Sequence, residues 1–128
     1  MDTGSQTMRA FAARQDERRV STGQRHLDRL RIAAPALAEM LVRDHGALRV
    51  WLFGSLAWGA ADGQSDLDLA TEGLPTGEYF RALGALLERA PGRVDLVRLE
   101  DAPESLRARI LAEGEVLLDR QPTRSSPG

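Results

Sequence analysis

The chain has 128 residues, no cysteine and a formal net charge of −2. This length predicts a single domain with its own packed core, because domains commonly span about 100–150 residues. The lack of cysteine excludes disulfides and thiolate metal sites, and no apolar run approaches the ~20 residues that a membrane helix needs. Composition therefore predicts a cytoplasmic protein with no membrane association, and the nearly balanced charge predicts no direct binding of nucleic acid.

The two ends of the chain differ in composition from the middle. The first 24 positions are polar and rich in arginine, with no sustained hydrophobic period. We expect residues 1–24 to form a flexible arm with at most one helical turn. Residues 121–128 are a polar tail with proline and serine, and we expect them to be disordered. One domain over residues 25–120 is predicted between these segments.

The first helix of that domain is expected to be interrupted. Apolar residues recur at helical spacing from Leu27 onward. Pro35 lies inside this run and is expected to break or kink the helix, because its ring clashes with the preceding turn. The stronger helix is then predicted over residues 36–44, and Gly46 ends it.

Further along the chain, short apolar segments alternate with segments of helical spacing. Strands are predicted at residues 48–53, 66–71, 94–99 and 116–118. Helices are predicted at residues 55–61, from about residue 77 to Pro91, and from Pro103 to Gly114, the last with Asp101 as its cap. Such alternation is typical of an α/β or α+β fold.

A Gly-Ser pair followed by two closely spaced aspartates is the most informative motif of the chain. Ten residues separate Gly54-Ser55 from Asp66, and Asp68 follows two positions later. In a strand, side chains at i and i+2 point to the same face, so both carboxylates would lie side by side while Leu67 enters the core. Adjacent carboxylates repel unless a cation lies between them, and hard oxygen ligands suit Mg²⁺. A Gly-Ser turn that opens a helix offers backbone N–H groups to phosphate. The motif therefore predicts chemistry on a nucleoside triphosphate.

Simpler interpretations of these residues exist. Aspartate is common beside turns, Gly54 could simply end a strand, and Ser55 could simply cap a helix. Ser65 could contact the nucleotide or only cap a turn. Two aspartates on one strand face are unfavourable for structure alone, however, which favours a metal site at Asp66 and Asp68.

A P-loop NTPase is excluded by the residues that follow the Gly-Ser pair. Gly54 and Gly59 have the spacing of a Walker A loop, but Ala60 and Ala61 occupy the positions where lysine and serine or threonine are required.

The histidines and tryptophans are expected to have ordinary structural roles. His26 and His45 are isolated, without the spacing of zinc ligands, and are predicted at the surface. Trp51 is predicted in the core, and Trp58 is predicted to pack between helix and sheet.

The Gly-Ser and Asp-x-Asp pattern resembles the polymerase-β-type nucleotidyltransferase superfamily, and the short chain is similar to its minimal nucleotidyltransferase branch. The resemblance covers roughly residues 25–119. It implies a nucleotidyltransferase-like fold, with a small mixed β-sheet and helices packed on one side. It also implies a third carboxylate on a later strand, which Asp95 fits. The chain departs from the pattern at Leu56 and Trp58, because family members often carry arginine just after the Gly-Ser pair.

The resemblance further implies the reaction and its site. Members transfer a nucleotide with two Mg²⁺ ions, which Asp66 and Asp68 would hold together, and Asp95 would complete the ion that activates the attacking hydroxyl. ATP would be the substrate. Its contacts would be Gly54, Ser55 and Ser65.

The acceptor is implied only by the branch that the chain resembles. Minimal nucleotidyltransferases of this kind are similar to antitoxins that pair with a HEPN-domain ribonuclease toxin, which implies transfer of AMP to a tyrosine hydroxyl of that toxin. Two alternatives remain open. One is a small-molecule nucleotidyltransferase resembling the aminoglycoside-modifying enzymes, and the other is an antitoxin that acts by binding alone.

Overall fold

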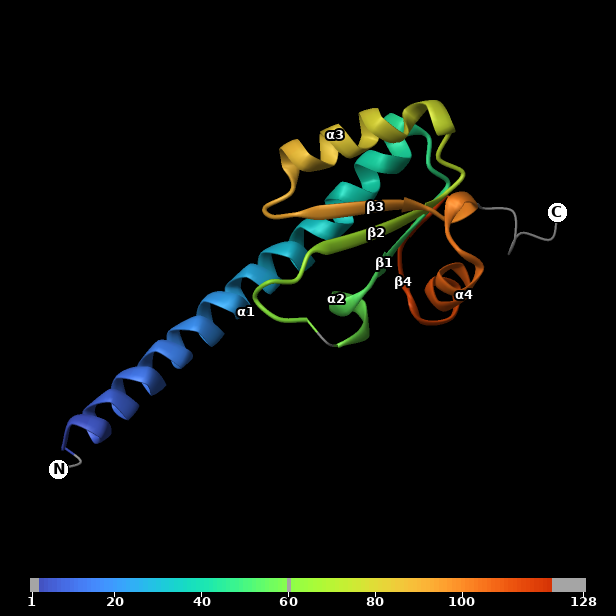
Figure 1. The fold of residues 1–128 in the computed structure, drawn as a ribbon. Helices are drawn as coiled ribbons and strands as arrows, with labels where there is room; N and C mark the ends of the chain where they lie inside the picture. The colour runs from blue at the N-terminus through green and yellow to red at the C-terminus, as the bar shows by residue number, and fades with distance from the viewer. Residues whose placement is uncertain (1–2, 60, 121–128) are drawn as a thin grey trace.

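The architecture is taken from a computed structural model that describes the backbone of residues 3–59 and 61–120, and side chains from residue 23 onward within those ranges. The residues that were predicted as a disordered tail, 121–128, lie outside the described residues. Two short 3-10 turns join the regular elements, at Thr76–Glu78 (η1) and Leu99–Asp101 (η2). The helices and strands of Figure 1 are α1 (Thr3–His45), β1 (Arg49–Phe53), α2 (Ser55–Trp58), β2 (Leu67–Glu72), α3 (Tyr79–Arg89), β3 (Val94–Arg98), α4 (Glu104–Glu113) and β4 (Glu115–Asp119).

Helix α1 is much longer than the sequence predicts. It is continuous from Thr3 to His45, and its N-terminal part extends away from the sheet (Figure 1). The expectation of at most one helical turn in the arm is therefore wrong, because the arginine, alanine and glutamine that are frequent there cost little in a helix. Whether the arm is flexible stays a prediction, as does the division of the chain at residue 24.

The predicted break at Pro35 is also wrong. Proline inside a helix costs about 3 kcal/mol. Leu30 and Leu41 are fully buried on either side of it, and Leu37 is 5% exposed. Each buried leucine contributes about 1.5–3 kcal/mol, so packing against the sheet outweighs the proline and keeps the helix intact.

The four strands form one mixed sheet in the order β3-β2-β1-β4. Strand β1 pairs antiparallel with β2 and with β4, and β2 pairs parallel with β3. A parallel pair needs a crossover connection, which α3 provides between β2 and β3. The predicted mixed sheet of an α/β fold is thus confirmed.

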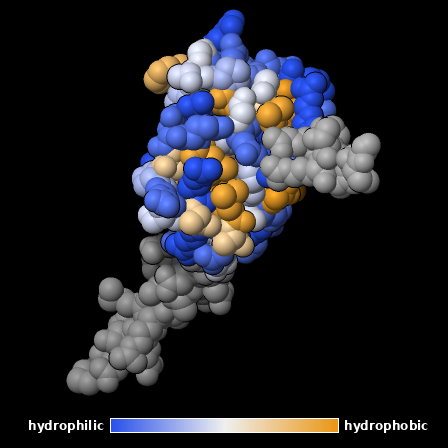
Figure 2. Space-filling view, turned by 90° about the vertical axis from the view of Figure 1, so that its right-hand side faces the viewer, coloured by the Kyte–Doolittle hydropathy of each residue, from blue (hydrophilic) through white to orange (hydrophobic). Residues whose placement is uncertain are grey.

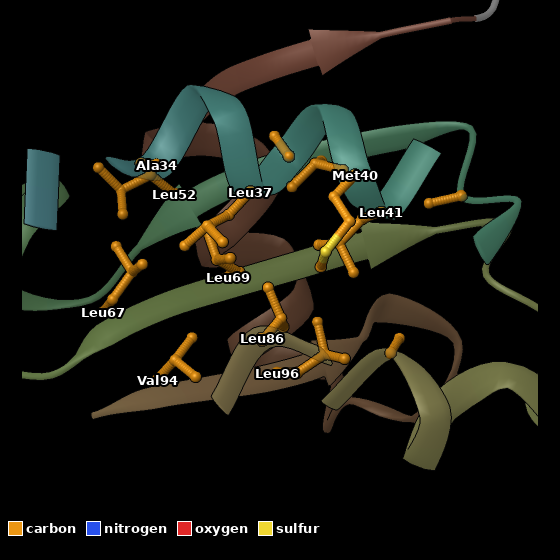
Figure 3. Close-up of a cluster of buried hydrophobic side chains, with 14 of the residues drawn as sticks. Ala34, Leu37, Met40, Leu41, Leu52, Leu67, Leu69, Leu86, Val94 and Leu96 are labelled. Carbon is orange, nitrogen blue, oxygen red and sulfur yellow. The ribbon is translucent and has the colours of Figure 1, made fainter. Parts of the chain in front are cut away.

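One face of the sheet is covered by α1 and α3, and this is where the larger core lies (Figure 3). Alternate residues of β1, β2 and β3 point into it, as the period of two requires. The side chains that Figure 3 labels in this core are Ala34, Leu37, Met40, Leu41, Leu52, Leu67, Leu69, Leu86, Val94 and Leu96.

The opposite face carries a smaller apolar cluster beneath α4. Ile110 of α4 is fully buried there against Trp51, which is 2% exposed, together with Phe53. The core position predicted for Trp51 is confirmed. The sequence does not predict this second layer, because α4 has only a few apolar residues at helical spacing. Helices therefore lie on both faces, with the larger layer formed by α1 and α3.

Two predicted roles near the helix ends are wrong. His45 is mostly buried rather than at the surface, and its Nδ1 lies 3.2 Å from Glu78 Oε1, which ties the end of α1 to η1. Asp101 does not cap α4, since the cap position is Pro103. Its carboxylate instead accepts a 2.6 Å hydrogen bond from Arg98.

The surface is mixed in character. On the face drawn in Figure 2, hydrophilic side chains surround a smaller group of hydrophobic ones. Within the described part of the chain, none of the helices is both long enough and apolar enough to cross a lipid bilayer. Among the residues whose side chains are described, the exposed large hydrophobic ones are Ile32, Leu48, Phe80, Leu87, Leu111 and Val116.

Candidate active site

Gly54 makes the sharp turn between β1 and α2. Its φ of 77° and ψ of −158° define a backbone conformation that is nearly exclusive to glycine. A Cβ at this position would lie 3.0 Å from Cγ of Asp68 and closer still to its Oδ2. Glycine is therefore required twice, once for the backbone angles and once so that the Asp68 carboxylate can approach the start of α2.

Asp68 and Asp95 lie side by side on neighbouring strands. They are register partners in the parallel pair of β2 and β3, and such strands are about 4.8 Å apart. Their neighbours Leu67 and Leu96 enter the core under α1 and α3. Both aspartates therefore project from the opposite face, the one that also carries Phe53 and α4. Asp95 is exposed, whereas Asp68 is half-buried.

Asp68 has the most perturbed carboxyl group of the site. Its burial, followed by the negative charges of Asp95 and then Asp66, raises its pKa to about 6. Both effects disfavour a negative charge at this position. The site thus concentrates more negative charge than its own groups neutralise, which is the condition that a bound cation would relieve.

Asp66 is arranged differently from the other two carboxylates. Strand β2 begins at Leu67, one residue later than predicted, and Asp66 forms an ion pair with Arg93 at 3.3 Å. No three histidine, cysteine, aspartate or glutamate side chains within residues 23–59 and 61–120 are grouped as a metal site would require. The structure therefore pairs Asp68 with Asp95 and leaves Asp66 beside Arg93.

The chemistry of the donors nevertheless fits a divalent cation. All three are carboxylates, the hard oxygen ligands that Mg²⁺ takes in proteins. The ion pair that holds Asp66 is weak, because the side chains of Asp66 and Arg93 are 42% and 78% exposed. Turning Asp66 away from Arg93 therefore costs little.

The two serines of the motif form one hydrogen-bonded loop. Ser55 Oγ donates to Ser65 Oγ at 3.1 Å, and the backbone N–H of Asp62 donates to the same oxygen at 2.9 Å. The N–H of Gln64 donates to the Asp62 carboxylate at 2.9 Å. Ser65 thus joins the loop before Asp66 to the beginning of α2. Its predicted contact with nucleotide stays a prediction.

Three residues that the sequence analysis did not assign to the site contact it. Arg31 of α1 donates to the carbonyl oxygen of Leu56 at 2.6 Å. The guanidinium of Arg109 from α4 lies 3.6 Å from the ring centre of Trp58. Arginines thus reach both positions at which the chain departs from the family pattern.

The third of these residues is His26, whose Nε2 donates to the carbonyl oxygen of Ser65 at 3.2 Å. His26 is thus half-buried and has a hydrogen-bond partner that the sequence does not predict. No local pattern marks this contact, since its partners lie 39 residues apart in the sequence.

With this geometry established, comparison with known proteins defines the class. The family model of polymerase-β nucleotidyltransferases matches residues 36–123, which is more than half of the chain. The chain therefore belongs to the polymerase-β nucleotidyltransferase family and is a nucleotidyltransferase. No curated protein sequence matches it closely enough to count as a relative.

Solved structures place it beside the minimal members of the family. It is 35% identical to a minimal nucleotidyltransferase, with a TM-score of 0.57, over 69% of this chain and 92% of that one. It is 26% identical to a chain of a toxin-antitoxin crystallised with AMP-PNP, with a TM-score of 0.58, over 68% of this chain and 74% of that one. A complex of a tri-AMPylated HEPN toxin from Shewanella oneidensis with an MNT antitoxin shares the fold, at 24% identity and a TM-score of 0.51, over 66% of this chain and 69% of that one.

Proposed function

We propose that this nucleotidyltransferase moves AMP from ATP to a tyrosine hydroxyl of a HEPN-domain toxin in the cytoplasm, and so acts as its antitoxin. The observation that carries the proposal is the pair of Asp68 and Asp95 beside the glycine turn at Gly54. The likeness to a toxin-antitoxin that was crystallised with AMP-PNP supports ATP as the nucleotide and a toxin as the partner.

Magnesium is part of the proposal. Asp66, Asp68 and Asp95 would hold two ions, which would stabilise the charge that develops at the α-phosphate. The tyrosine hydroxyl would lose its proton and bond to the α-phosphate, and pyrophosphate would leave. The raised pKa of Asp68, caused by burial and by Asp95 and Asp66, supports a cation at this position. Asp66 would exchange its exposed ion pair with Arg93 for the metal.

The other motif residues would orient the nucleotide. The turn at Gly54 leaves no side chain between the Asp68 carboxylate and the start of α2. Phosphate oxygens could therefore reach the carboxylates and the backbone N–H groups near Ser55 together. Ser65 would hold this arrangement through its hydrogen bond with Ser55.

The exposure of Asp95 supports a macromolecular acceptor. Its side chain projects from the sheet face and is exposed, while Asp68 beside it is half-buried. A tyrosine that projects from a partner protein could approach this open side. A small acceptor would gain little from it, because small-molecule sites usually enclose most of their ligand.

The proposal is tested by incubating the protein with labelled ATP, Mg²⁺ and a purified HEPN-type partner. The label should appear on the partner and depend on Mg²⁺. Asp66→Asn should remove most of the label, whereas Asp44→Asn, which changes an exposed aspartate at the far end of α1, should leave it unchanged.

Other outcomes decide between the alternatives. If Asp66→Asn protects cells from the toxin as well as the unaltered protein does, the protein neutralises by binding alone. If no partner is labelled but aminoglycosides are, the small-molecule alternative replaces the proposal.

A further inference from the structure

A short stretch of α1, residues 23–31, lies against the segment that carries the Gly-Ser motif. This stretch precedes residue 36, where the match to the family begins. The segment that it contacts runs from Gly54 to Asp66, of which residues 54–59 and 61–66 are described, and contains α2 and the loop before β2. The contacts therefore join a part of the chain outside the family match to the loop of the active site.

The closest approach is between two glycines. A Cβ on Gly63 would lie 3.0 Å from Cα of Gly23, and a Cβ on Gly23 would lie 3.2 Å from Cα of Gly63. Helix and loop thus meet backbone to backbone, which brings the following turns of α1 within reach of the loop.

Two hydrogen bonds then fix the segment at both ends. His26 Nε2 donates to the carbonyl of Ser65 at 3.2 Å, directly before Asp66. Arg31 donates to the carbonyl of Leu56 at 2.6 Å, inside α2. Because Ser55 and Ser65 are themselves hydrogen-bonded, the two donors from α1 hold a closed unit.

Gly92, just before β3, limits the position of the His26 ring. A Cβ on Gly92 would lie 2.8 Å from Cε1 of His26, so only glycine leaves room for the ring. His26 also lines a pocket of about 220 Å³ whose other lining residues are Gly63, Gln64, Ser65, Asp66 and Arg93. The ring and the first carboxylate of the motif thus border the same space.

We propose that His26 and Arg31 are positioning residues for nucleotidyl transfer, which hold the loop from Gly54 to Asp66 in the conformation that receives the nucleotide. This inference rests on the proposed function for its kinetic consequence. Its structural consequence, that α1 restrains the loop, can be measured without any acceptor.

The test compares two replacements of His26. His26→Leu keeps a side chain of comparable bulk but removes the donor, and His26→Gln keeps an N–H donor near the same place. We expect His26→Leu to raise KM for ATP about three- to tenfold, the range that the loss of one hydrogen bond gives, and to change kcat less. His26→Gln should restore most of the affinity. Arg29→Ala, at an exposed position of α1, is the matched control and should have no effect.

A second variant displaces the His26 ring without replacing His26. Gly92→Ala should displace the ring and raise KM in the same direction, with His26 itself unchanged. A merely structural role would lower the melting temperature of these variants without changing KM.

Hydrogen exchange separates this inference from the proposed function. The Ser65 N–H, which donates to the Asp62 carbonyl at 3.0 Å, should exchange faster in His26→Leu than in the unaltered protein or in Arg29→Ala. This holds even if no acceptor is ever labelled. Unchanged exchange of residues 62–66 together with unchanged KM, or a His26→Gln variant as impaired as His26→Leu, would overturn the inference.

Discussion

The two faces of the sheet are built from the same strands but serve different purposes. On one face, Leu67 and Leu69 of β2 are fully buried under α1 and α3. On the other, Asp68 lies between them in sequence and stands next to Asp95 of β3. A single strand thus contributes alternately to the core and to the site.

The separation of core and site on opposite faces explains how a small chain can tolerate a carboxylate whose ionised form is disfavoured. The raised pKa of Asp68 shows that its ionised form is disfavoured by burial and by its carboxylate neighbours. The two flanking leucines contribute about 1.5–3 kcal/mol each through burial, and together they offset that cost. Mutations on the two faces should therefore separate activity from stability.

The largest effect is expected from the carboxylate face. Asp68→Asn should lower the rate of nucleotidyl transfer by about 10²–10³-fold or more, the range found when one preorganised electrostatic group is removed from a reaction centre. Its melting temperature should not fall. The measurement is single-turnover labelling of the acceptor, and retention of more than a tenth of the rate would contradict the assignment.

Mutations of the core face should instead lower stability and leave the reaction rate nearly unchanged. Leu69→Ala should lower the free energy of unfolding by about 2–5 kcal/mol, because it leaves a cavity beneath α1. The rate per folded molecule should change little. Denaturant unfolding gives the first quantity and active-site titration the second. Leu87→Ala, at a side chain that is 57% exposed, should cost less than about 0.5 kcal/mol.

Gly54 has backbone angles that favour glycine and lies against the Asp68 carboxylate, so its replacement should affect both stability and activity. Gly54→Ala should destabilise the protein by about 1–3 kcal/mol because of its backbone angles, and should also displace the Asp68 carboxylate. Gly84→Ala is the matched control. Gly84 lies in α3 with open space around it, so alanine there should stabilise by about 0.5–1 kcal/mol. Equal effects of the two replacements on thermal unfolding would contradict this role of Gly54.

The smallest effect concerns pH. The pKa of the Asp68 carboxyl is about 6 in the folded protein and near its ordinary value of 3.8 in the unfolded chain. Well below pH 3.8 the group is protonated in both states. Between about pH 4 and 6 the unfolded chain releases its proton first, so the folded state loses relative stability as pH rises.

This loss is absent when the carboxyl is replaced by an amide. Without added metal, Asp68→Asn should therefore gain about 1 kcal/mol relative to the unaltered protein between pH 4 and pH 7, with screening of the half-exposed group allowed for. Denaturant unfolding of both proteins across this range gives the difference. A constant difference, or one of opposite sign, would show that Asp68 is not destabilised in the folded state.

Much of the candidate site on the face of Asp68 and Asp95 could be predicted from the sequence because the strand period is local. Alternation of leucine and aspartate around Asp68 fixes which side chains share a face, and the same holds for Asp95 between Val94 and Leu96. The approximate positions of the four strands follow from the same pattern, and the structure confirms them to within one residue at their ends.

The parts that could not be predicted depend on contacts between distant segments. The Arg31 contact with Leu56 spans 25 positions of sequence, and the His26 contact with Ser65 spans 39. No local hydrophobic period predicts either of these contacts. The continuity of α1 through Pro35 is a similar case, because packing against the sheet overrides a local helix-breaking preference.

The central claim is that the face carrying Asp68 and Asp95 binds the nucleotide with its metal. Calorimetric titration of the protein with ATP and Mg²⁺ at neutral pH tests it most directly, in parallel with the double variant Asp68→Asn, Asp95→Asn. We expect saturable binding that requires Mg²⁺ and is largely lost in the double variant, while the melting temperature of that variant is retained. Binding of equal affinity by the double variant would contradict the account.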